Sequence, residues 1–180
     1  IKREIHYLHF HNLIRSIAFS LFGIFIPIYL LNLGYTLKSV FTYFLILQIL
    51  TFAAFFFGYY LAKKIGYRGL ILTSAPLVIA TIVLLQILSS THISVYLIAV
   101  IAGLENGFYW LPIHSFFTKL TEKKKKGTHL SNYMIFGQLA GLFGPLVGAI
   151  VATLFGFKYL FLAVLIFIII YICMVNNYFY

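Results

Sequence analysis

One acidic side chain, Glu105, lies inside an apolar stretch that is long enough to cross a membrane. If a helix begins near Ser94, Glu105 lies about 16 Å along it, close to the middle of such a membrane. A charge at that depth is costly, so acidic residues there usually face a cavity or a partner. We therefore expect this carboxyl group to bind and release a proton. A neutral carboxyl that is hydrogen-bonded to a neighbouring helix is the alternative.

Polar and aromatic residues follow Glu105 at helical spacing. Asn106, Trp110 and His114 recur every four residues and would form one stripe on a helix, and Tyr109 lies one turn after Glu105. We expect this face to line a path for a solute. For His114 alone, contact with lipid headgroups at the helix end is the stronger alternative.

The elements that must hold these residues are predicted to be membrane-spanning helices. Hydrophobic residues make up 63% of the chain and charged residues only 9%, and the mean hydropathy is +1.03. A water-soluble domain would need a more polar surface. Six stretches approach or exceed the roughly 20 residues that a helix needs to cross a bilayer. We expect an all-α membrane protein whose six transmembrane helices cover about 13–32, 39–61, 70–89, 94–117, 131–154 and 158–175.

The positive charges predict how these helices are oriented. With a cytoplasmic N-terminus, eleven of the 13 Lys and Arg residues fall on the cytoplasmic side and two on the other. Short basic loops stay in the cytoplasm, so we expect a multi-pass protein of the cell membrane, plasma or inner, with both termini cytoplasmic. The eleven are Lys2, Arg3, Arg15, Lys63, Lys64, Arg68, Lys119 and Lys123 to Lys126; the two are Lys38 and Lys158.

Several basic and histidine residues are expected to contact the membrane surface. The run Lys123 to Lys126 is predicted to bind anionic lipid, and nucleic acid is not an expected partner. Arg15 should extend to the cytoplasmic interface. Residues 1–12 are predicted to form an interfacial amphipathic segment, and the histidines within it, His6, His9 and His11, are not expected to hold a metal. No cofactor is expected.

A twelve-residue segment occurs twice in the chain, at residues 61–72 and 151–162. The copies share a glycine, an aromatic residue and a cation, at Gly66-Tyr67-Arg68 and Gly156-Phe157-Lys158. Three predicted spans separate the copies, so the second half should be inverted relative to the first. Inverted repeats of three plus three helices are typical of secondary transporters and place a binding site near the midplane.

In its motifs and their order, the chain resembles the N-terminal six-helix half of a major facilitator superfamily transporter of bacterial or archaeal type. The segments that carry the resemblance are a loop signature with Gly58, Lys63, Lys64, Gly66 and Arg68, a glycine-proline motif with Gly141, Gly144, Pro145 and Gly148, the span entry Gly156 to Phe161, and Tyr109 to His114.

This resemblance implies secondary active transport of a small solute by alternating access, with proton coupling and efflux as further expectations. It implies that the loop signature takes part in the conformational change and that spans 1 and 4 line the cavity. It also implies a second six-helix half of the same polypeptide, so residues 176–180 would form a cytoplasmic end before that half.

Other classes of protein remain to be weighed against a transporter. The glycine-proline motif is also expected from close helix packing alone, since small residues four apart permit it. An enzyme is not expected, because the chain contains no Asp and no catalytic motif such as Gly-x-Ser-x-Gly or His-Glu-x-x-His. A six-span membrane scaffold, or a transporter or channel that dimerises with itself, is the alternative function.

Overall fold

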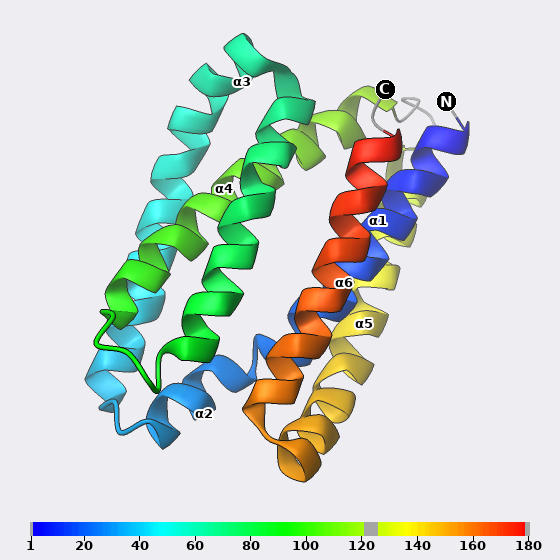
Figure 1. Ribbon diagram of the computed structural model, residues 1–180. Helices are drawn as coiled ribbons and strands as arrows, with labels where there is room; N and C mark the ends of the chain where they lie inside the picture. Colours follow the sequence, from blue (N-terminus) through cyan, green and yellow to red (C-terminus); the bar gives the residue numbers. More distant parts are fainter. Residues whose placement is uncertain (1, 121–125, 179–180) are drawn as a thin grey trace. The chain divides into compact units, whose positions relative to one another are not determined.

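The computed structural model of the chain describes residues 2–120 and 126–178, and every regular element in that part is a helix (Figure 1). This agrees with the predicted all-α membrane protein. Five segments of the described residues are long and apolar enough to cross a membrane. The helices are α1 (Lys2–Phe22), α2 (Phe25–Asn32), α3 (Leu37–Ile87), α4 (Val95–Leu120), α5 (Lys126–Phe155) and α6 (Phe157–Tyr178).

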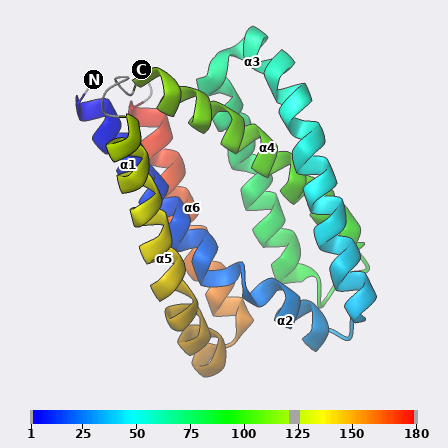
Figure 2. The same cartoon turned by 180° about the vertical axis from the view of Figure 1, so that it is seen from behind.

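Helix α3 covers two of the predicted spans, 39–61 and 70–89, as one element of 51 residues. The two spans are the two arms of this element, and they meet at Gly66, where the chain reverses and whose φ of 74° and ψ of 167° are not helical. Figures 1 and 2 show the chain rising along one arm of α3 and returning along the other. A single glycine suffices because, without a Cβ atom, it adopts a positive φ at little steric cost.

Both ends of the chain are helical where they are described. Span 13–32 is divided between α1 and α2, and α1 begins at Lys2, so the segment 1–12 is helical and continuous with the span. Its place at the membrane surface stays a prediction. Helix α6 extends to Tyr178, so the expected cytoplasmic end at 176–180 is helical as far as it is described. Spans 94–117, 131–154 and 158–175 correspond to α4, α5 and α6.

The chain divides into two compact units, and the first contains Ile1–Phe25 and His114–Tyr180. Its centre is α1, which contacts both α5 and α6. Against α6, the rings of Phe22 and Phe161 meet edge to face with centroids 6.5 Å apart. The apolar side of α6 that is buried consists of Leu160, Phe161, Val164, Ile168 and Tyr171.

The second unit, Ile26–Ile113, is built from α2, α3 and most of α4. The phenol of Tyr29 on α2 donates a hydrogen bond of 2.9 Å to the carbonyl oxygen of Leu85 on the second arm of α3. Thr36 begins α3, because its hydroxyl accepts a hydrogen bond from the backbone N–H of Ser39, at 3.2 Å. The buried apolar residues of the second arm include Leu70, Ile71, Val78, Ile82 and Leu85.

The two copies of the repeated segment share one feature of backbone geometry. Gly66 and Gly156 occupy matching positions of the repeat, and both have positive φ, 74° and 88°. Each glycine ends one helical stretch and precedes the next. The sequence similarity of the copies is thus accompanied by a similar local turn, while the inversion of the complete halves stays a prediction.

Replacing Gly66 by alanine should lower the stability of the protein. The angles at Gly66 fall in a region of positive φ and extended ψ that only glycine adopts readily, and strain of this kind costs about 2 kcal/mol. The measurement is thermal unfolding of the purified protein in detergent. Gly127→Ala on α5 is the control, since nothing lies within 4 Å of a Cβ atom there and the backbone is helical. Equal melting temperatures for the two variants would contradict the prediction.

Candidate functional site

Helix α4 carries all five residues predicted to line a solute path. Glu105 and Tyr109, one turn apart, are almost completely buried, with 3% and 0% of their surface exposed. Asn106 and Trp110 are half-buried, and His114 is exposed. The predicted stripe of Asn106, Trp110 and His114 therefore runs from a partly covered region to an open one.

Glycines bring α4 into direct contact with the backbone of α3. A Cβ atom at Gly103 would lie 2.6 Å from the carbonyl oxygen of Leu47, and one at Gly107 would overlap the side chain of Ala54. Successive residues on a helix turn by about 100°, so Glu105, two positions from each glycine, projects from the opposite face of α4. The glycines thus fix α4 against the first arm of α3 and direct the carboxyl group away from that arm.

The aromatic pair next to Glu105 has a defined geometry. The rings of Tyr109 and Trp110 meet edge to face, with centroids 5.0 Å apart and an interplanar angle of 74°. Near the end of α4, the hydroxyl of Thr118 donates a hydrogen bond to the carbonyl oxygen of His114. Glu105, Asn106, Tyr109 and Trp110 belong to the unit Ile26–Ile113, and His114 is the first residue of the second segment of the other unit. Four of the five candidate residues therefore lie in the same compact unit.

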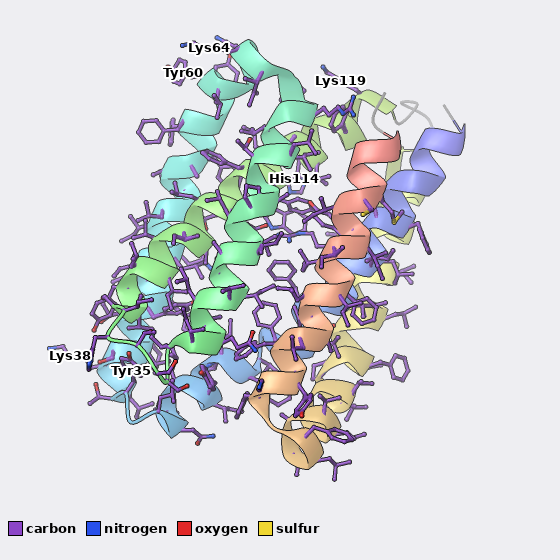
Figure 3. All side chains as sticks on the ribbon, in the orientation of Figure 1. Tyr35, Lys38, Tyr60, Lys64, His114 and Lys119 are labelled. Carbon is purple, nitrogen blue, oxygen red and sulfur yellow. The ribbon has the colours of Figure 1, made fainter. Side chains whose placement is uncertain are left out.

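The predicted loop signature is spread over two turns of helix and the reversal of α3. Gly58 is buried, and a Cβ atom there would lie 3.1 Å from a methyl carbon of Leu111 on α4. The ammonium group of Lys63 lies 4.3 Å from the ring centroid of Tyr59 and 5.7 Å from that of Tyr60. Lys64 is exposed (Figure 3), and Arg68 is half-buried after the turn at Gly66. Gly58 is thus a packing position rather than a loop residue.

The glycines of α5 differ in what they contact. Cβ atoms at Gly144 and Gly148 would overlap Ser20 and Leu21 of α1, so the two helices approach closely at these positions. By contrast, nothing lies within 4 Å of a Cβ atom at Gly141. Pro145 is half-buried within the helix.

Three polar residues of α1 that were not among the site candidates predicted from the sequence are buried in the structure. His11, Asn12 and Arg15 have only 2%, 4% and 3% of their surface exposed. Arg15 was expected to extend to the cytoplasmic interface. Its guanidinium is buried, with its carbon 3.9 Å from the ring centroid of Phe19, and its depth in the membrane stays a prediction. The apolar segment begins at Phe10, so Arg15 lies five residues inside it, and this position was the available signal.

The predicted surface residues and histidines are only partly described. Lys123 to Lys125 of the expected lipid anchor, and the side chains of His6 and His9, lie outside the described residues. Among the side chains that are described, no group of three or more His, Cys, Asp or Glu could hold a metal ion.

A comparison with known families gives one match, to the family model of the Major Facilitator Superfamily, over residues 8–179. The matched range extends into both units and includes the candidate residues of α3, α4 and α5. No curated protein matches the chain.

Proposed function

Because the chain belongs to the Major Facilitator Superfamily, and is therefore a membrane transporter of that kind, we propose that it moves a small solute by alternating access coupled to protons. The proposal assigns the proton to Glu105 and the solute path to the face of α4 that carries it.

The burial of Glu105 is the observation that carries the proposal. Within the apolar segment Val95–Phe116, Glu105 lies about 15 Å from either end, and 3% of its surface is exposed. Intramembrane acids of this kind commonly serve in proton relays, because a charge at the bilayer centre is too costly to keep without a use. In the proposed cycle, proton binding neutralises the carboxyl group before the site changes its access, and proton release follows on the other side.

The neighbours of Glu105 suit recognition of a small molecule. Solute sites combine aromatic surface with a few polar groups that fix orientation. Trp110 and Tyr109 supply adjacent rings that meet edge to face at 74°, and the half-buried Asn106 supplies an amide. We propose that the exposed His114 lies at the mouth of this path.

The basic residues of α3 support an orientation in the membrane. Lys38 lies near the start of the first arm and Lys63 near its end, and Figure 3 shows Lys38 and Lys64 at opposite ends of that arm. The 25 intervening steps of helix span about 37 Å, close to the thickness of a bilayer with its headgroups. We propose that the end with Lys63 and Lys64 faces the cytoplasm and anionic lipid, with both termini on the same side of the plasma or inner membrane.

The remaining motifs enter the proposal through family resemblance. Gly58, Lys63, Lys64, Gly66 and Arg68 would take part in the change of access, and Gly141, Gly144, Pro145 and Gly148 would mark an efflux antiporter. A second six-helix half of the same polypeptide would complete the cavity.

Proton flux in proteoliposomes tests the proposed function. The full-length protein is reconstituted with a trapped pH-sensitive dye, and solute gradients from a panel of sugars, amino acids, cations and organic acids are imposed. At least one solute should move protons in proteoliposomes but not in protein-free liposomes. If solutes cross the membrane without protons, the proposed coupling to protons is wrong. If neither solutes nor protons cross, the proposed transport function is wrong.

A further inference from the structure

The first arm of α3 carries two lysines near its end at Gly66 and a row of exposed aromatic side chains before them. Lys63 and Lys64 are exposed, and neither forms an ion pair with another described residue. The aromatic side chains, each with at least half of its surface exposed, are Phe52, Phe56, Tyr59 and Tyr60. Residues three or four apart share a face of a helix, so these rings follow one another along the arm and lead to Lys63.

The aromatic rings form two pairs, and the second pair holds the cation. The rings of Phe52 and Phe56 meet edge to face with centroids 5.2 Å apart, and those of Tyr59 and Tyr60 do so at 5.6 Å. The ammonium group of Lys63 lies 4.3 Å from the ring centroid of Tyr59 and 5.7 Å from that of Tyr60. A cation over an aromatic ring is attracted to its face, so the charge of Lys63 is held at the end of the aromatic row.

The length of this row matches one leaflet of a bilayer. The eleven steps of helix from Phe52 to Lys63 span about 16 Å, and half of a hydrocarbon core is about 15 Å thick. Tyrosine rings favour the boundary between the hydrocarbon and the headgroups, and Figure 3 shows Tyr60 and Lys64 together at this end of the arm. The surface therefore has a positive end at the level of the headgroups and an aromatic face at the depth of the acyl chains of the same leaflet.

We propose that these six residues form a binding site for one anionic phospholipid. The lipid phosphate accepts hydrogen bonds from the ammonium groups of Lys63 and Lys64, and the acyl chains lie along the rings of Phe52 and Phe56. A phosphatidylcholine fits the apolar part, but its own cation would lie beside the two lysines, so the site favours a headgroup with net negative charge. Such a site goes beyond a general contact of this end with anionic lipid, and it does not depend on the transport of a solute.

Lipid-dependent thermal unfolding of the full-length protein in an uncharged detergent tests the proposal. Dioleoyl phosphatidylglycerol is the anionic probe, and dioleoyl phosphatidylcholine has the same acyl chains with no net charge. Glycerol phosphate supplies the phosphate without acyl chains. Phosphatidylglycerol should raise the melting temperature in a saturable manner, because a ligand that binds the folded protein stabilises it. At the same concentrations, phosphatidylcholine and glycerol phosphate should leave the melting temperature nearly unchanged.

Variants of exposed residues on the same arm locate the site. The double variant Lys63→Gln and Lys64→Gln should weaken the binding of phosphatidylglycerol by about tenfold or more, since it removes both charges that attract the lipid. Tyr59→Ala keeps both charges but removes the ring beside Lys63, so it should also weaken binding. Lys38→Gln, at the other end of the arm, removes an equally exposed charge and should leave the affinity unchanged.

Three outcomes would overturn the lipid site, and none of them bears on transport. They are equal stabilisation by phosphatidylcholine, equal stabilisation by glycerol phosphate, and a loss of affinity in Lys38→Gln as large as in the double variant. Solute-driven proton flux in a protein with any of these outcomes would reject the lipid site and keep the transporter. Binding of phosphatidylglycerol that depends on Lys63 and Lys64, in a protein that moves no solute, would support the lipid site and reject transport.

Discussion

Glu105→Gln should abolish solute accumulation driven by a pH gradient while the protein still exchanges solute down its own gradient. Glutamine has nearly the shape of glutamic acid and keeps hydrogen-bonding capacity, but it cannot bind and release a proton. Since Glu105 is the acid placed at the middle of α4 with 3% of its surface exposed, no proton would be carried with the solute at this position. Proteoliposomes measure both quantities, accumulation against a gradient and counterflow without one.

The matched variant for this experiment is Glu105→Asp. It retains a carboxyl group, so transport should still depend on pH, at a rate changed by the shorter side chain. Proton-driven accumulation that persists in a folded Glu105→Gln protein would remove Glu105 from the coupling mechanism. Loss of counterflow together with accumulation would instead assign Glu105 to solute binding.

The second large effect is expected at Gly107, where replacement by leucine should prevent α4 from packing on α3. Even one added carbon would overlap the side chain of Ala54 and lie 2.9 Å from the carbonyl oxygen of Thr51. The contact involves backbone on both helices, so no rotamer change relieves it, and the cost is expected at the upper end of the range of about 1–3 kcal/mol that is typical of overpacking. The melting temperature of the protein and its yield as a monodisperse species in detergent are the measurements.

Gly141→Leu on α5 provides the comparison for this prediction. No atom lies within 4 Å of a Cβ atom at Gly141, and the residue is exposed, so the same change should leave the melting temperature nearly unaltered. If Gly107→Leu melted like the wild type, the close approach of α3 and α4 would not be a feature of the folded protein.

The helices were largely predictable from the sequence, because long apolar runs admit no other structure in a bilayer. Spans near α4, α5 and α6 followed from such runs. The connection at 62–69 contains the reversal at Gly66, and helix continues on both sides of that glycine. The sequence did not show this, because Lys63, Lys64 and Arg68 are typical of a basic surface loop but are also good helix formers. Only Gly66 interrupts the helix.

The candidate site was predictable in part. Glu105 could be singled out because an acid in an apolar run is rare. Arg15 also lies within an apolar run, but its burial depends on which helices pack around α1. Packing at Gly103 and Gly107 shows the same limit. Their four-residue spacing was visible, yet the glycines named instead included Gly141, where an added Cβ atom would have no neighbour within 4 Å. The spacing in the sequence identifies a row of small residues on a helix, but only the fold determines which row contacts a neighbouring helix.

The one-residue reversal of α3 has a consequence for biosynthesis. Helical residues follow Gly66 directly, so residues of the two arms meet with little chain between them, as Gly58 and Leu70 do. Contacts between residues close in sequence cost little chain entropy and form early in folding. We therefore expect the two arms to leave the translocon as a helical hairpin, and Gly66 sets how soon after its synthesis the second arm can pack on the first.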